Sequence, residues 1–291
     1  MKVDKFRTVI IYIIIILLGL VCLLPLLNIV AISFSSSAAV EGNMVGLIPV
    51  GFSTAAYEKI LEDSQFWHSF LISVERVVLT LIINFVLIVL MAYPLSKTNA
   101  QFRGRNIYAN LMIFAMLFNG GMIPTFLLVK SYGLLNTVWA LVLPGAVPIF
   151  NVILVMNFFA AVPKELEEAA FIDGANPLQV LTKIFIPISK PVLATVSLFS
   201  IVGSWNDFYS GLIYMSKAAY YPLMTYIQSL QINVEDLIKQ GNLSAVVNSA
   251  SLGNTNLNAA KIVVAVIPLL LIYPLLQRYF VSGIVVGSVK G

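Results

Sequence analysis

The residues best suited to chemistry lie in one charged stretch of an otherwise apolar sequence, EEAAFIDGANPLQVLTKIFIPISKP at positions 167–191. The small residues Ala169, Ala170 and Gly174 would let another surface approach closely. The carboxylate of Glu168 could orient that surface. These residue types predict the docking of a partner protein rather than catalysis, and an amphipathic connector lying on a membrane surface is the alternative.

A second polar group, Trp205, Asn206 and Asp207, interrupts a hydrophobic run. A carboxylate within a membrane is costly and usually faces a cavity or a partner. The indole could stack on a sugar ring and Asn206 could bind its hydroxyls, so we expect these residues and Asn119 to line a solute path. A place for Asp207 at the outer interface, paired with a subunit, is an equal alternative. Other asparagines either line the path or link helices: Asn84, Asn151 and Asn157.

Catalytic and metal-binding patterns are missing from the sequence. His68 and Cys22 are single residues of their kinds, so neither a disulfide nor a cysteine–histidine zinc site is indicated. No GxxxxGK[ST], HExxH or GxSxG is present. The net charge of +4 is dispersed, which does not indicate nucleic-acid binding. We expect no catalytic residue, no metal and no cofactor on this chain.

The composition predicts an all-α membrane protein, since 59% of the 291 residues are hydrophobic and 10% are charged. A membrane-spanning helix needs about 20 apolar residues. Six runs meet or approach this length, and we expect one membrane domain over 1–291 with spans at about 9–32, 70–95, 107–129, 134–162, 191–215 and 262–277. The first run is too long for the apolar part of a secretory signal.

Lysine and arginine predict the orientation of these spans. Most of them fall at the N-terminus, near 97–105, in 163–190 and near the C-terminus, so both termini and the loop 163–190 should be cytoplasmic. The loop 216–258 should then be external. Glu75 and Arg76 are neighbours that point different ways on a helix, which favours interfacial anchors.

Local signals predict two short helices within the cytoplasmic loop. Pro163 suits the start of a helix over 164–170, and Gly174 suits its left-handed end. Asn176 and Pro177 suit the start of the next helix. Four apolar residues then recur on one face and should form a ridge: Leu178, Leu181, Ile184 and Phe185.

The spacing in this loop resembles the EAA motif of ABC importer permeases, EAA-x3-G-x9-I-x-LP. Residues 168–170, Gly174, Ile184 and Pro187 match it, and Ile186 replaces the leucine. The run at 204–208 and the glycine-rich tail resemble carbohydrate permeases typified by the smaller membrane subunit of the maltose importer. The runs at 119–124 and 143–145 resemble its oligosaccharide-importing branch.

This resemblance implies a type I ABC importer permease in a bacterial plasma (inner) membrane. It assigns contact with a cytoplasmic ATPase dimer to a coupling helix and to the C-terminal tail. The residues implied are Glu168, Ala169, Ala170, Gly174, Ile184 and Pro187 in the loop, and Gly287, Lys290 and Gly291 in the tail. ATP and Mg²⁺ would bind the ATPase. A second, usually different permease and an external solute-binding protein would complete the complex.

Three other functions compete with an oligosaccharide importer. An ABC permease for a non-sugar solute would share every feature above. An ion-coupled transporter is disfavoured because intramembrane carboxylates are few, and a membrane enzyme because no catalytic constellation is present. The external loop 216–258 could likewise be a solvated linker rather than a contact for the solute-binding protein.

Overall fold

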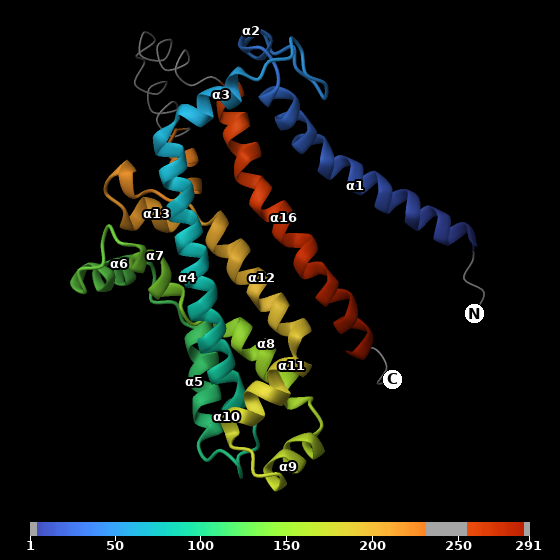
Figure 1. Ribbon diagram of the computed structural model, residues 1–291, viewed down its shortest axis with the longest axis vertical. Coiled ribbons are helices and arrows are strands. Elements are labelled where there is room, and N and C mark those ends of the chain that lie inside the picture. The colour runs from blue at the N-terminus through green and yellow to red at the C-terminus, as the bar shows by residue number, and fades with distance from the viewer. Residues whose placement is uncertain (1–4, 231–254, 288–291) are drawn as a thin grey trace. The chain divides into compact units, whose positions relative to one another are not determined.

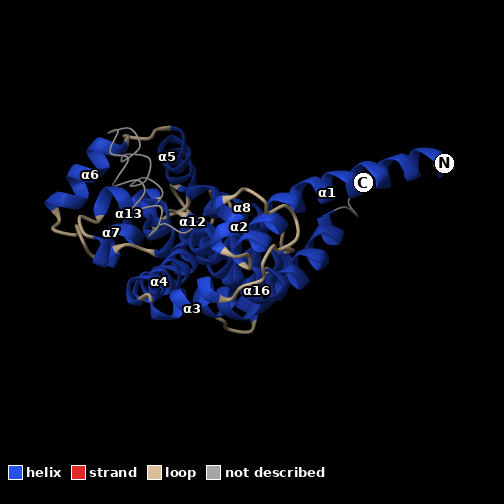
Figure 2. Ribbon diagram, turned by 90° about the horizontal axis from the view of Figure 1, so that it is seen from above, coloured by secondary structure: helices blue, strands red, loops and turns tan. Residues whose placement is uncertain are grey.

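The structure, a computed structural model, describes residues 5–230 and 255–287. Over these residues Figure 2 shows helices and loops and no strand. The all-α expectation from composition is therefore confirmed for the described part of the chain.

Figure 1 colours the helices in chain order, from blue at α1 to red at α16. In chain order they are α1 Lys5–Ser33, α2 Ser37–Glu41, α3 Ala55–Glu62, α4 Ser64–Leu95, α5 Arg105–Leu117, α6 Met122–Ser131, α7 Val138–Val142, the 3₁₀ turn η1 Leu143–Gly145, α8 Ile149–Ala160, α9 Lys164–Ile172, α10 Pro177–Val180, the π-helical turn η2 Leu181–Phe185, α11 Ile186–Ile188, α12 Lys190–Asn206, α13 Tyr209–Tyr214, the 3₁₀ turn η3 Ala218–Tyr220 and α16 Thr255–Gly287.

Three described helices are long and apolar enough to cross a membrane: Arg7–Ser33, Ser64–Leu95 and Thr255–Pro274. The number rises to six if three bent pairs each form one span. These pairs are α5 with α6, bent by 111°, α7–η1 with α8, bent by 47°, and α10–α11 with α12, bent by 84°. The expected spans over 107–129 and 134–162 are thus both broken, and the prolines within them, Pro124, Pro144 and Pro148, predict interrupted helices.

Local chemistry explains the two breaks. Between α5 and α6, Gly121 adopts a φ of +89°, and its N–H donates to Oδ1 of Asn119 at 2.9 Å, so this backbone turns instead of continuing the helix. Before α8, Pro148 lacks an N–H and takes an extended conformation. Counting apolar residues finds such spans but not their interruptions.

The last helix is much longer than the expected 262–277. Lys261 ends the apolar run in the sequence, yet it lies inside α16 with 4% of its surface exposed. Its Nζ pairs with Asp63 at 2.7 Å, and this partner lets the helix begin earlier, at Thr255. A paired charge does not end a helix, which is why hydropathy underestimated the length of α16.

The chain divides into two compact units, of which the first contains Met1–His68 and Tyr226–Pro268. The span Arg7–Ser33 of α1 has an 18-residue apolar window with no buried residue. Elsewhere in this unit Asp63 accepts hydrogen bonds from Tyr226 at 2.9 Å and from the Phe66 N–H at 3.0 Å, beside its pair with Lys261. Burial opposes ionisation of Asp63, but these donors outweigh it and lower its pKa.

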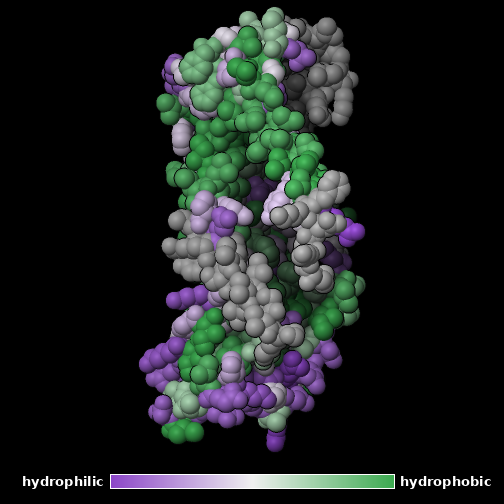
Figure 3. Space-filling view, turned by 90° about the vertical axis from the view of Figure 1, so that its right-hand side faces the viewer, coloured by the Kyte–Doolittle hydropathy of each residue, from purple (hydrophilic) through white to green (hydrophobic). Residues whose placement is uncertain are grey.

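The second unit contains Ser69–Thr225 and Leu269–Gly291. Its core joins the end of α4, α8, the α10–η2 segment and the start of α12. Val155, Val180 and Val196, one from each of three elements, are essentially fully buried there. In Figure 3 hydrophilic side chains gather at the lower end, where α9 lies in Figure 1. The core thus fixes the α10–η2 segment next to the ends of two long helices.

We expect Gly211→Ala to destabilise the protein. A methyl group at Gly211, in α13, would collide with the side chain of Thr225. Overpacking of this kind costs about 1–3 kcal/mol, so the thermal midpoint of the detergent-solubilised protein should fall. Gly203→Ala is the matched control, because its methyl group meets no atom within 4 Å and Ala is the better helix former. Equal midpoints for the two variants would contradict the packing described here.

Candidate functional site

The first candidate site is the coupling segment, which we define as residues 163–188. Its first helix, α9, carries Glu165 and Glu167 in the first turn, where they favour the positive end of the helix dipole. It ends in a Schellman motif: Gly174 has φ +81°, its N–H donates to Phe171 O at 3.1 Å, and Ala175 N–H donates to Ala170 O at 2.9 Å. The predicted role of Gly174 is confirmed, with the helix two residues longer than expected.

The second part of the coupling segment begins with a capping box. The Asn176 side chain accepts from the Gln179 N–H at 2.9 Å, and the Gln179 side chain accepts from the Asn176 N–H at 2.9 Å, with Pro177 at the first helical position. Helix α10 then passes through η2 and α11, and the chain bends by 84° into α12. The expected elbow of two short helices is therefore present.

A buried ion pair holds α9 to the end of α4. Lys97 Nζ lies 2.7 Å from Oε2 of Glu167, with side-chain exposures of 10% and 11%. The same ammonium lies 4.1 Å from the ring centres of both Tyr93 and Phe185. Burial lowers the pKa of Lys97, although Glu167 pulls it the other way. Glu167 is thus a structural anchor that the sequence analysis missed in favour of Glu168.

The EAA residues themselves mostly face outward. Glu168, Ala169, Gly174 and Pro187 are exposed, and Ala170 and Ile184 are partly buried. A Cβ atom at Gly174 would meet nothing within 4 Å. A shallow cavity of about 490 Å³ opens here, and its lining is Ala170, Asp173, Gly174, Ala175, Gln179, Val180, Lys183 and Ile184. The segment therefore offers a recess in which three small residues, Ala170, Gly174 and Ala175, lie beside larger polar and apolar side chains.

The expected apolar ridge is divided between the core and the surface. Leu181 and Phe185 are buried in the core, whereas Leu178 is 62% exposed. The π-helical turn at 181–185 changes the helical period, so one-face spacing does not hold across it. Leu178 and Ile172, which is 86% exposed, are left as apolar side chains on the surface.

The second candidate site is a polar cavity of about 260 Å³ between α4, the η1–α8 region and the end of α12. Arg76 forms two hydrogen bonds with Asp207: Nη1 to its carbonyl oxygen at 2.9 Å and Nη2 to Oδ2 at 2.5 Å. The Arg76 side chain is 4% exposed and that of Asp207 29%. The polar residues in the lining are Arg76, Thr80, Asn84, Asn151, Ser200, Ser204, Asp207, Ser210 and Tyr214.

Two buried polar atoms at this cavity are without a hydrogen-bond partner in the part of the chain that the structure describes. Within the described residues, Nε of Arg76 and Oγ1 of Thr80 are buried and have no hydrogen-bond partner. The Asn84 amide, oriented to satisfy both of its ends, donates to Thr80 O at 3.3 Å and Ala146 O at 3.0 Å and accepts from Ser200 Oγ at 3.3 Å. Buried polar groups normally have partners, so these two groups are exceptions within the described residues.

Comparisons with known proteins agree with this architecture. Residues 2–286 match the family model described as the binding-protein-dependent transport system inner membrane component. The chain belongs to this family. It is an inner membrane permease subunit, and members of the family are not enzymes.

Two curated relatives come from Bacillus subtilis strain 168. Protein LplC is 40% identical over 273 residues, covering 94% of this chain and 91% of LplC. The polygalacturonan/rhamnogalacturonan transport system permease protein YtcP is 40% identical over 288 residues, 99% of each chain. In a crystal structure of a bacterial ABC transporter involved in the import of the acidic polysaccharide alginate, one chain is 32% identical with a TM-score of 0.84, covering 96% of this permease and 98% of that chain.

Of the four residues expected together on a solute path, Trp205, Asn206, Asp207 and Asn119, one lines the polar cavity of this permease. That residue is Asp207. Trp205 is 4% exposed and packs edge-on against Phe70, with ring centres 5.6 Å apart, and Asn206 is exposed outside the lining. Asn119 caps the break between α5 and α6. The four residues therefore do not form one site.

The structure corrects the prediction for Arg76 and extends those for the asparagines. Arg76 is a buried partner of Asp207 rather than an interfacial anchor. Asn84 and Asn151 line the cavity, and Asn157 is exposed outside it. An intramembrane carboxylate requires a cation, and that requirement is the sequence signal that could have identified Arg76.

The tail residues of the permease stay untested. Lys290 and Gly291 lie outside the described residues, and Gly287 is the last residue of α16.

We expect Asp207→Asn to lower the stability of the permease by leaving the buried guanidinium of Arg76 without a counter-charge. The loss should be about 2 kcal/mol, below the 3–5 kcal/mol typical of a fully buried pair, because Asp207 is 29% exposed. Thermal unfolding would measure it. The double variant Arg76→Gln with Asp207→Asn removes both charges and should recover part of the loss. If it is no more stable than Asp207→Asn alone, the pair does not hold these helices together.

Proposed function

We propose that this permease is one membrane subunit of an ATP-driven importer for a carbohydrate, in particular an oligosaccharide. The observation that carries the proposal is the 40% identity with the polygalacturonan/rhamnogalacturonan permease over 99% of both chains. The likeness to a chain of the alginate importer, again over nearly the whole length, supports the same class of cargo. A whole-length likeness includes the helices that would enclose a solute.

The coupling segment is the contact for the ATPase in this proposal. Its exposed small residues Ala169 and Gly174 would allow close approach, while Leu178 and Ile172 offer apolar area for burial. The anchor of Glu167 to Lys97 would pass a movement of α9 on to α4. ATP and Mg²⁺ would bind the ATPase dimer on the cytoplasmic side, where the C-terminal residues Gly287, Lys290 and Gly291 would also make contact.

Transport would proceed by alternating access, in which groups of helices rock as rigid bodies. The polar cavity around Arg76 and Asp207 suits a place on the path, because its two charges neutralise each other and its remaining donors and acceptors match hydroxyl groups. ATP binding would favour one orientation only through a difference in affinity between the two states.

Two further partners complete the proposed importer. A second permease would cover apolar helix surface such as that of α1, whose apolar window has no buried residue. A solute-binding protein would dock on the external side, where the loop 216–258 is its expected contact. Residues 231–254 of that loop lie outside the described residues.

Reconstituted uptake tests the cargo. Vesicles containing this permease, its second permease and its ATPase, with the solute-binding protein outside, should accumulate labelled oligosaccharides only when ATP is enclosed. A panel of neutral and uronic-acid oligosaccharides would identify the cargo. Uptake of amino acids or peptides but of no oligosaccharide would contradict the carbohydrate proposal. Uptake that needs an ion gradient and no ATPase would contradict the whole assignment.

Gly174→Leu should separate the permease from its ATPase while leaving it in the membrane. The side chain would fill the recess beside Ala170 and would also adopt a left-handed backbone conformation, which costs about 1–2 kcal/mol. Gly133→Leu is the matched control, because Gly133 has φ +67° and equally open surroundings outside the coupling segment. Co-purification of the ATPase should fail for the first variant only. Equal ATPase binding by both would remove the segment from the contact.

A further inference from the structure

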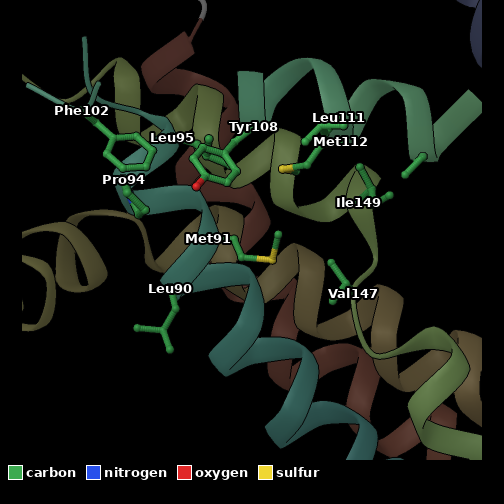
Figure 4. A pocket seen from close by; sticks show the side chains of 11 residues that line it. Leu90, Met91, Pro94, Leu95, Phe102, Tyr108, Leu111, Met112, Val147 and Ile149 are labelled. Atoms are coloured by element: carbon green, nitrogen blue, oxygen red, sulfur yellow. The ribbon is translucent and has the colours of Figure 1, made fainter. Parts of the chain in front are cut away.

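A long apolar groove lies beside the core of the second unit, apart from both candidate sites. Its volume is about 430 Å³, and it runs between the end of α4, residues 108–115 of α5 and the start of α8. Figure 4 shows the side chains of these elements facing a common space. The lining is Leu90, Met91, Pro94, Leu95, Phe102, Tyr108, Leu111, Met112, Ala115, Val147 and Ile149.

The groove is open to the surroundings of the helices. Leu90, Tyr108 and Leu111 in its wall are 51%, 55% and 57% exposed. Met112 and Leu95, at 8% and 4%, form its floor. Its walls belong to the candidate spans α4, α5 and α8, so the medium around it is the bilayer. A lining almost free of polar atoms offers no hydrogen bonds to the hydroxyl groups of a saccharide. It matches a hydrocarbon chain instead.

Positive charge gathers where the groove meets the α4–α5 loop. Phe102 lines the groove and Arg103 follows it directly. Arg105 donates from Nε to Leu95 O at 2.9 Å, which holds the loop against the end of α4. The sequence contains no Asp or Glu from 76 to 164. The charge of Lys97 is neutralised by Glu167. Arg103 is exposed, and within the part of the chain that the structure describes it makes no hydrogen bond or ion pair.

We infer that this groove binds one acyl chain of an anionic phospholipid, with the phosphate group near Arg103. The chain would contact Met91, Leu111 and Ala115, and Tyr108, which has a hydroxyl group, would lie toward the interface as tyrosines commonly do. Basic residues beside a membrane attract anionic headgroups. An anionic phospholipid needs apolar walls for its acyl chain and a positive charge for its phosphate group. A neutral detergent-like molecule would use the apolar walls but not the charge.

The bound lipid would touch the core that supports the coupling segment. Leu95 and Met112 belong both to the groove and to the core cluster that contains Val180 and Phe185. An acyl chain on this floor would contact two members of the cluster into which α10 and η2 pack. The proposed site is therefore a place where lipid composition can affect the stability of the coupling segment, independently of which solute is transported.

Photolabelling of the complete importer tests the site. The complex would be placed in nanodiscs of phosphatidylcholine with phosphatidylglycerol that carries a diazirine on one acyl chain, irradiated and digested. We expect label on peptides covering 90–95 and 108–115. Ala115→Phe fills the groove and should remove most of it. Ile113→Phe adds an aromatic ring on the same helix at a 48% exposed position outside the lining and should leave the label unchanged.

Arg103→Gln tests the charge. It should weaken the preference of the site for phosphatidylglycerol over phosphatidylcholine by about fivefold, the effect of one basic residue near a membrane surface. Thermal unfolding of each variant checks that it is folded. Label that persists in Ala115→Phe would overturn the site, and an unchanged preference in Arg103→Gln would overturn the headgroup assignment. If an Ala115→Cys variant crosslinks to another subunit instead, the groove is a protein interface and the inference is wrong.

Discussion

A charged side chain that leaves water must find an opposite charge, and in this chain that constraint connects segments far apart in sequence. Three ion pairs occur among the described residues, Arg76–Asp207, Lys97–Glu167 and Lys261–Asp63. The cationic side chains are exposed by only 4%, 10% and 5%. Removing one partner of such a pair is costly because the other charge stays buried. Each pair therefore specifies a particular neighbour, which the many interchangeable apolar contacts of a membrane protein cannot do.

Local features of the coupling segment could be predicted from sequence because their physics is local. A left-handed Gly174 and an N-cap at Asn176 each depend on a few adjacent residues, and both were found as expected; the reciprocal bond to the Gln179 side chain that completes the capping box was not predicted. The ion pairs could not be predicted in this way, since Arg76 and Asp207 are 131 residues apart and Lys97 and Glu167 are 70 apart. Hydropathy likewise gave the number of apolar runs, and Pro148 predicted the break before α8, but the turn at Gly121 was not predicted.

The three neighbouring residues expected on the solute path do not share one cavity, for a geometric reason. Trp205, Asn206 and Asp207 are consecutive, and consecutive helical residues point in directions about 100° apart. They cannot share one face while the helix continues, and here Trp205 turns into the core while Asp207, just past the end of α12, turns to the cavity. Residues on α4 spaced by four, Arg76, Thr80 and Asn84, line the cavity instead. A periodic search for polar residues within apolar helices would have found that set.

Two ion pairs of the second unit, Arg76–Asp207 and Lys97–Glu167, together with α4 and α12, connect the two candidate sites. Arg76 lies in the first half of α4, at the cavity. Lys97 lies just beyond the C-terminal end of α4 and contacts α9. At roughly 1.5 Å per residue, Arg76 and Lys97 are about 30 Å apart along the helix. Helix α12 starts directly after the coupling segment and ends next to Asp207. Since both helices are connected to the coupling segment at one end and to the Arg76–Asp207 pair at the other, α9 cannot shift along α4 without straining that pair or bending a helix. Chains of packed elements of this kind can carry coupling between two sites, so α4 and α12 are the helices through which we expect a movement at the coupling segment to reach the cavity.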